Sequence, residues 1–186
     1  MLARTTRRIR HIARNAQDRL LRPETLVQAG QTPYDVIADD GLVKLRHYRP
    51  AEVRHAVPFV IVPPLAINML IYDLFPQRSL IRFLLEQGFN VYLVDWGSPT
   101  RRHAHYNLGT YARKLLPGFL QQVREHAGQQ ALTLYGWSMG GGIALVYAAI
   151  SGDPDIRNII TVGTAIDGHA NGLMGQIGRA SCRERV

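Results

Sequence analysis

The stretch LTLYGWSMGGGIALVYAA, residues 132–149, carries the strongest structural signal in the chain. Its first four residues form the short apolar run of a buried strand, and residues 140–150 have the apolar, alanine-containing composition of a helix. Between them lies a G-x-S-x-G sequence at residues 136–140. The order of strand, glycine-rich turn and helix predicts a sharp bend with Ser138 at its tip.

A serine on such a bend is well placed to act as a nucleophile. A tight strand-to-helix turn exposes the hydroxyl at the carboxyl edge of a sheet, where the helix dipole favours a developing negative charge. Gly136 and Gly140 would keep the neighbouring backbones free of side-chain clashes, and Gly141 and Gly142 are expected to add room for packing the helix on the strand. We therefore predict Ser138 to be a nucleophile. The alternative is a glycine-rich turn without chemistry.

An acyl-transfer intermediate also needs backbone N–H groups that hold its oxyanion. The first donor predicted here is Met139, the residue after the nucleophile. The second is expected from the loop that follows an earlier strand, which begins with Pro63 and Pro64. Because proline has no N–H, the donor would be Leu65 or Ala66, and the sequence does not decide between them.

Short apolar runs alternate with helical patterns through the rest of the chain. The expected strands are residues 32–38, 42–48, 59–62, 91–96, 132–135 and 158–162, and the expected helices are residues 80–87, 108–128 with a break at Pro117, and 140–150. The first two strands should form an antiparallel pair, because a turn-forming Asp-Asp-Gly joins them. Near-continuous apolar strands separated by helices indicate an α/β fold: a mostly parallel sheet flanked by helices, as in α/β-hydrolases.

In that fold the catalytic acid and histidine follow the serine along the chain. Asp153 and Asp155 lie in a polar segment and are predicted to be turn formers. Asp167 and His169 follow the last strand at a spacing too short for two partners on separate loops. The acid and the histidine are therefore expected beyond residue 175.

The last ten residues, IGRASCRERV at 177–186, resemble the translated start of a common short-read sequencing adapter. We predict a non-native tail here, the alternative being a natural basic tail. The α/β-hydrolase domain would then occupy residues 32–176 and be truncated after about the sixth strand. Its last strand would be an open sheet edge with bare apolar surface, so the fragment is expected to be poorly soluble or inactive. The tail also holds the chain's single cysteine, so neither disulfides nor cysteine metal sites are expected.

The positive charge of the chain is concentrated at its two ends. Residues 1–22 carry a formal charge of +6 and residues 177–186 carry +2, so the remaining residues contribute none of the total of +8. Residues 1–22 have the apolar spacing of a basic amphipathic helix, which would either dock on its own domain or lie on an anionic lipid surface. Nucleic-acid binding is not expected, because no aromatic platform accompanies the arginines. We expect a cytoplasmic protein, with granule or membrane association as an open alternative.

A second polar segment, GSPTRRHAHYN, follows the strand at residues 91–96. His103 and His105 stand there beside Arg101 and Arg102, at the sheet edge expected to hold Ser138. This group would suit an anion such as a phosphate, whereas the simpler interpretation is a solvated polar loop. No third ligand accompanies the histidines, so no metal site is predicted.

Residues 62–100 and the segments around residues 136–149 and 158–173 resemble the polyhydroxyalkanoate synthases. The matching positions are Pro63, Pro64, Asp73, Leu74, Pro76, Ser79, Gly88, Asp95, Trp96, Gly97 and Pro99. The resemblance implies acyl transfer from hydroxyacyl-CoA thioesters into polymer. No cofactor is expected. One departure is clear: those synthases have a cysteine where this chain has Ser138.

That departure leaves three functions open. A serine ester is a more stable intermediate than a thioester, and it favours transfer to water or an alcohol. The first hypothesis is a serine acyltransferase of the synthase-like kind acting on acyl-CoA. The second is a carboxylic-ester hydrolase, an esterase or lipase, and the third is a non-catalytic protein that binds an anionic lipid surface or a polymer granule.

Overall fold

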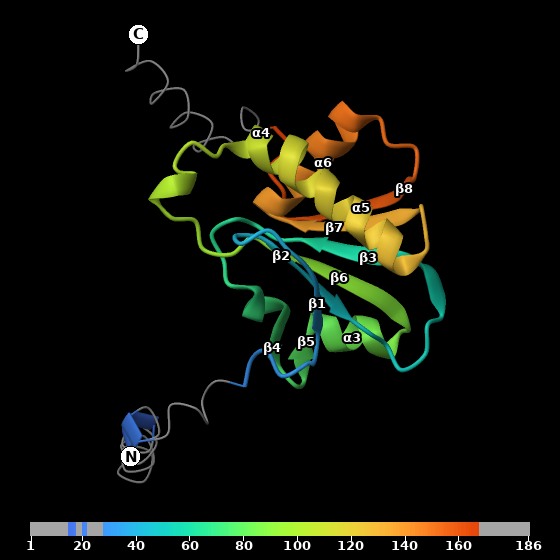
Figure 1. Cartoon of the computed structure of the whole chain (residues 1–186). Helices are drawn as coiled ribbons and strands as arrows, with labels where there is room; N and C mark the ends of the chain where they lie inside the picture. Colours follow the sequence, from blue (N-terminus) through green and yellow to red (C-terminus); the bar gives the residue numbers. More distant parts are fainter. Residues whose placement is uncertain (1–14, 18–19, 22–27, 168–186) are drawn as a thin grey trace.

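The computed structural model describes residues 15–17, 20–21 and 28–167 (Figure 1). Residues 15–17 and 20–21 are helical, and the side chains of Leu20 and Leu21 are exposed. The remainder of the basic segment 1–22, the tail 177–186 and His169 lie outside the described residues. The predictions made for them stay predictions.

Six strands form one sheet in the order β1-β2-β6-β3-β7-β8. Their bounds are β1 Asp35–Asp39, β2 Lys44–Tyr48, β3 His55–Val62, β6 Phe89–Asp95, β7 Leu132–Trp137 and β8 Ile156–Val162. Strand β2 is antiparallel to both β1 and β6, whereas β6, β3, β7 and β8 are mutually parallel. The expected mostly parallel sheet and its antiparallel initial pair are therefore confirmed.

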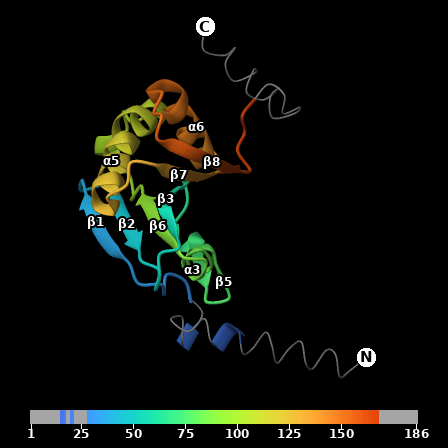
Figure 2. The same ribbon diagram turned by 90° about the vertical axis from the view of Figure 1, so that its right-hand side faces the viewer.

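Helices cover both faces of this sheet (Figure 2). They are α3 Leu80–Glu86, α4 Leu108–Thr110, α5 Leu116–Ala127 and α6 Met139–Ser151, with short 3-10 turns at Met69–Tyr72 and Arg101–His103. The expected break at Pro117 takes the form of a π-helical turn, Tyr111–Leu115, between α4 and α5. Pro117 then stands in the first turn of α5, directly after the π-helical turn in which the Leu116 N–H donates to the carbonyl of Tyr111.

The core has two layers because the parallel strands are buried on both sides. Val60 and Leu134 pack toward α5 and α6, together with Ile143 of α6. Ile61, next to Val60 in β3, faces the opposite way and packs with Ile81 of α3. The alternation of neighbouring apolar residues between two covered faces explains why the strands are almost continuously apolar in sequence.

Two local features complete the fold. A small ribbon of β4 (Asp73–Phe75) and β5 (Arg78–Ser79), not expected from the sequence, precedes α3. Among the described residues β8 forms an edge of the main sheet, and Ile160 and Val162 are 42% and 43% exposed. Within residues 28–167 the edge is thus partly apolar and exposed, whereas the truncation after the sixth strand stays a prediction.

Candidate active site

Ser138 occupies the bend between β7 and α6. Its backbone has φ 51° and ψ −123°, and it is the only non-glycine residue with positive φ in the described part of the chain. Such a conformation costs about 1–3 kcal/mol and persists only where surrounding contacts impose it. Here the Ser138 N–H donates to the carbonyl of Val162 at 2.8 Å, and its own carbonyl accepts from Thr164 Oγ1 at 3.1 Å. The end of β8 therefore holds the bend, and Ser138 itself is exposed.

Two of the four surrounding glycines, Gly136 and Gly140, are sterically required by neighbouring backbone, and a third faces a side chain. A Cβ at Gly136 would lie 2.5 Å from the nitrogen of Gly141, and one at Gly140 would lie 2.6 Å from the carbonyl carbon of Pro63. A Cβ at Gly141 would collide with the hydroxyl of Thr164. Gly142 is different, because a Cβ there would meet nothing within 4 Å. The expectation that Gly142 adds room for helix packing was wrong.

The close approach at Gly140 brings the loop after β3 against the start of α6. The N–H of Met139 is the first of α6 and has no intrahelical acceptor. Within the described residues, the N–H groups of Leu65 and Ala66 also have no protein acceptor. The three N–H groups named from the sequence therefore have no protein acceptor among the described residues, and their role as oxyanion donors, with the choice between Leu65 and Ala66, stays a prediction.

Trp96 holds this loop, a role that the sequence did not reveal. Its side chain is 1% exposed, and its indole N–H donates to the carbonyl oxygen of Pro63 at 2.7 Å. The bond joins the end of β6 to the end of β3, 33 residues apart in sequence. A tryptophan directly after an apolar strand was the available signal, but its partner lies too far along the chain for a local pattern to show.

Other positions that carry the family resemblance are also structural. Asp73 accepts the backbone N–H of Thr32 at 2.7 Å, and Ser79 caps α3 by accepting from the Arg82 N–H at 3.0 Å. The Asp95 carboxylate forms a half-buried ion pair with Arg46. These residues build the frame around the bend and do not contact Ser138.

Asp153 and Asp155 lie at the opposite edge of the sheet from Ser138, before β8 begins. The Asp153 carboxylate accepts from Arg124 Nη2 at 2.6 Å and from the Tyr147 hydroxyl at 2.5 Å. Burial alone would raise the pKa of Asp153, but these hydrogen bonds outweigh it and hold the pKa below its ordinary value. Asp153 also accepts the N–H of Asp155 at 3.0 Å, as a turn-forming aspartate does.

The described residues include no histidine hydrogen-bonded to Ser138. Asp167 is described, but its suggested partner His169 is not, so the dyad stays untested. Likewise, the residues covered by the structure hold no group of three or more His, Cys, Asp or Glu side chains that could bind a metal ion.

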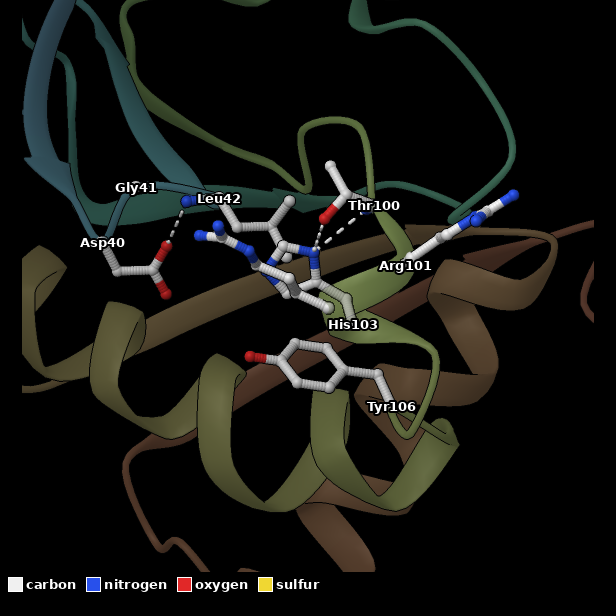
Figure 3. Close-up of a pocket in the computed structure, with 8 residues that line it drawn as sticks. Asp40, Gly41, Leu42, Thr100, Arg101, His103 and Tyr106 are labelled. Atoms are coloured by element: carbon white, nitrogen blue, oxygen red, sulfur yellow. Dashed lines mark hydrogen bonds between the residues drawn. The ribbon is translucent and has the colours of Figure 1, made fainter.

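The polar loop after β6 lines a pocket of about 670 Å³ (Figure 3). His103, Arg101 and Arg102 form one wall, and the β1–β2 turn at residues 40–42 forms another. The His103 imidazole accepts the backbone N–H of Thr100 through Nδ1 at 3.0 Å. His105 lies outside the lining and contacts the ring of Tyr106 edge-on at 4.9 Å. The sequence placed this loop at the edge of Ser138, and the sheet order bears that out.

No helix in the described part of the chain has the length and apolar character needed to cross a membrane.

Comparison with known proteins gives two family matches. Residues 58–176 match the family described as "alpha/beta hydrolase fold", and residues 24–84 match "Poly-beta-hydroxybutyrate polymerase (PhaC) N-terminus". The "Poly(3-hydroxyalkanoate) polymerase subunit PhaC" of Haloferax mediterranei is 38% identical over 141 residues, which cover 74% of this chain and 28% of that protein. The protein of the same name from Haloarcula marismortui is 33% identical over 161 residues, covering 82% and 34%.

Solved structures agree on the fold. The Francisella virulence factor BioJ matches 88% of this chain and 52% of its own, with a TM-score of 0.58 at 15% identity. A monoacylglycerol lipase from Paleococcus ferrophilus matches 77% and 51%, with a TM-score of 0.54 at 22% identity. The chain spans about a third of the length of these two polymerases. The fold, the bend at Ser138 and these matches agree, and the chain belongs to the α/β-hydrolase family, within which its sequence is polyhydroxyalkanoate synthase-like.

Proposed function

We propose that this chain carries the nucleophile of an acyl-transferring enzyme, with Ser138 accepting an acyl group from a hydroxyacyl-CoA thioester. The observation that carries the proposal is the strained, exposed backbone of Ser138 beside uncommitted N–H groups. Strain of this kind is retained where it serves a site. The similarity to poly(3-hydroxyalkanoate) polymerases supports acyl transfer as the class of reaction.

The first step would form an ester on the chain. Ser138 Oγ attacks the thioester carbonyl carbon, and the carbonyl oxygen becomes an oxyanion that accepts from Met139 and from Leu65 or Ala66. The C–S bond then breaks, and the CoA thiol leaves with a proton. A base must take the Ser138 proton. We expect this base to be a histidine, oriented by an acidic residue, and we expect both among residues other than those the structure describes.

The second step decides between two activities. If the hydroxyl of another hydroxyacyl unit attacks the Ser138 ester, a new ester bond lengthens a polymer and frees the serine. If water attacks, the product is a free acid and the protein is a carboxylic-ester hydrolase. The serine favours transfer to an oxygen nucleophile, whereas the similarity to the polymerases favours chain growth.

The test uses the full-length gene product with 3-hydroxybutyryl-CoA in one assay and a short nitrophenyl ester in the other. Ser138→Ala should lower the turnover of both substrates by at least about 10³-fold. Ser98→Ala is the matched control, an exposed serine after β6 at the same sheet edge, and should keep full activity. Polymer in the first assay identifies a synthase, and only free acid identifies a hydrolase. Undiminished turnover in Ser138→Ala would refute the proposal.

The third hypothesis, a non-catalytic surface binder, has its own test. Deleting residues 1–22 should abolish co-sedimentation with anionic vesicles or polymer granules if the basic segment mediates binding. If co-sedimentation persists after the deletion, the basic segment does not make the contact.

A further inference from the structure

The pocket beside the β1–β2 turn has a composition that the proposed chemistry at Ser138 does not explain. Its lining includes two arginines and a histidine, against a single acidic residue, Asp40 (Figure 3). Within the described ranges, neither Arg101 nor Arg102 forms an ion pair with a carboxylate, in contrast to Arg46 and Arg124. The pocket therefore has an unneutralised positive charge.

The single carboxylate in the lining is already committed to the backbone. Asp40 Oδ1 accepts the N–H of Leu42 at 3.0 Å and that of Val43 at 2.6 Å, which fixes the β1–β2 turn. With Asp40 counted, the lining still has a net formal charge of +1, because Arg101 and Arg102 are both present. Oδ1 of Asp40 is therefore occupied by the turn, and the positive charge of Arg101 and Arg102 exceeds the negative charge of Asp40.

His103 is held in a tautomer that suits an anion. Its Nδ1 accepts the N–H of Thr100, so the ring proton of the neutral imidazole is on Nε2. The ring of Tyr106 packs edge-on against His103 at 5.2 Å and limits its rotation. Figure 3 shows His103 between the β1–β2 turn and Tyr106, while Arg101 extends outward from the loop. Arg101 is exposed, and its guanidinium would have to change rotamer to meet a group bound beside His103.

The two walls of the pocket are fixed relative to each other. Gly97 has φ +64°, and a Cβ there would collide with the carbonyl oxygen of Leu42. The Gly97 N–H also donates to Asp95 Oδ1 at 3.0 Å. The start of the polar loop is therefore packed against the β1–β2 turn, and the pocket is part of the folded frame.

We propose that this pocket binds a phosphate group. Guanidinium groups and a neutral imidazole N–H are donors suited to phosphate oxygens, and the pocket opens at the carboxyl edge of the sheet. Strand β6, which leads into the polar loop, is separated from β7 by β3 alone and so lies about 10 Å across the sheet from the strand that ends at Ser138, and the pocket lies on the β1–β2 side of β6. Two sources share this chemistry: the nucleotide phosphates of a CoA thioester, an assignment that rests on the proposed function, and free inorganic phosphate or pyrophosphate.

The first test measures pyrophosphate binding by calorimetry at low ionic strength. Arg101→Gln/Arg102→Gln should weaken binding by about tenfold or more, because charge-assisted hydrogen bonds are lost. Arg113→Gln/Arg157→Gln removes the same charge from exposed positions elsewhere and should change the affinity by less than about twofold. Absence of pyrophosphate binding, or equal weakening in both double variants, would overturn the proposal. Circular dichroism of each variant establishes that it is folded.

The second test separates the sources and isolates the proposed function. If CoA binds more tightly than pyrophosphate, and dephospho-CoA and pantetheine bind progressively less, the site serves the nucleotide end of CoA. If CoA and pyrophosphate bind alike, the ligand is free phosphate. The Ser138→Ala variant should bind all of them unchanged. Phosphate binding without Ser138-dependent acyl transfer would refute the proposed function alone, and acyl transfer without phosphate binding would refute this site alone.

Discussion

The two edges of the sheet use their polar groups in opposite ways. At the carboxyl edge, Ser138 is strained and the N–H groups of Met139, Leu65 and Ala66 have no protein acceptor within the described residues. At the amino edge, Arg124, Asp153 and Tyr147 form a closed set of hydrogen bonds.

The amino edge also carries a directional chain of side-chain hydrogen bonds. His47 Nε2 donates to Asn90 Oδ1 at 2.6 Å, Asn90 donates to the Tyr92 hydroxyl at 3.3 Å, and Tyr92 lies 2.9 Å from His126 Nδ1. Only His47 Nδ1 among these groups is buried without a partner. The two edges therefore differ in function. At the amino edge the polar groups bond to one another and stabilise the fold, whereas at the carboxyl edge several have no protein partner and could bind a ligand. Each prediction below tests one side of that difference.

The largest effect is expected at the carboxyl edge, where a methyl group has no space. Gly140→Ala should lower the free energy of unfolding by about 3 kcal/mol or more, because the loop after β3 and the start of α6 must separate. Gly142→Ala is the matched control, two residues on in the same helix and facing open space. It should raise stability by up to about 1 kcal/mol, the usual gain of alanine over glycine in a helix. Urea denaturation of both variants makes the comparison, and equal effects would contradict it.

The next largest loss of stability is expected at the amino edge. Asp153→Asn should lower the free energy of unfolding by about 2–3 kcal/mol, because the Arg124 side chain, 10% exposed, loses its carboxylate partner. Because the pKa of Asp153 is lowered in the folded state, its contribution is present above the ordinary value of 3.8 and is lost as pH falls below it. The variant should therefore flatten the acid limb of the stability profile.

Glu52→Gln supplies the control for that ion pair. Its partner is Arg54, and both side chains are more than half exposed. Solvent screens such a pair, so denaturation of Glu52→Gln should give little measurable change. If Glu52→Gln and Asp153→Asn proved equally destabilising, the closed set of bonds at the amino edge would have no special role.

The sheet and the bend were predictable because their signals are local. Each parallel strand is an apolar run, and the strand-glycine-helix order around Ser138 fits in fewer than twenty residues. The ribbon β4–β5 was missed because strands of three and two residues carry no periodic pattern. Gly142 was misjudged because a run of glycines does not show which members face a neighbour.

The polar contacts at both edges of the sheet were less predictable because they join distant segments. Trp96 meets Pro63 across 33 residues, and His47 meets Asn90 across 43. Asp153 was expected to form a turn, and it does, but its bond to Arg124 spans 29 residues and has no local signature. Residue type indicated which groups were polar, whereas the fold determined which of them are satisfied.

A smaller loss of stability is expected when the hydrogen bond that holds the loop after β3 at the carboxyl edge is removed. Trp96→Phe removes the indole N–H and leaves the buried Pro63 carbonyl without its donor, which should cost about 1–2 kcal/mol of stability. If this bond positions the oxyanion donors, kcat of the full-length enzyme should fall further than KM changes. Tyr111→Phe is the control: it keeps the ring that packs edge-on against Trp96 at 5.2 Å, and should leave kcat unchanged. A kcat for Trp96→Phe equal to that of the unmodified enzyme would show that the loop holds its position without the indole.

The smallest effect expected is a dependence of the free energy of unfolding on pH, caused by His47 at the amino edge. Burial is the main cause that lowers the pKa of His47 below its ordinary value of 6.5, and the nearby charges of His126 and Arg49 act in the same direction. The hydrogen bond with Asn90 and the charge of Asp35 oppose that shift but do not reverse it. The unfolded chain therefore takes up a proton at a pH where folded His47 resists it, so stability is full above about 6.5 and declines as the pH falls.

His47→Gln should make that decline shallower, because glutamine can still donate to Asn90 but does not titrate in this range. His105→Gln is the control, since His105 is an exposed histidine on the carboxyl-edge loop and should leave the slope unchanged. Denaturation of the three proteins at pH 7.5, 6.5 and 5.5 measures the slopes. If His105→Gln made the slope shallower and His47→Gln did not, the prediction would be wrong. The acid sensitivity would then belong to the carboxyl edge, at an exposed histidine and not at a buried one.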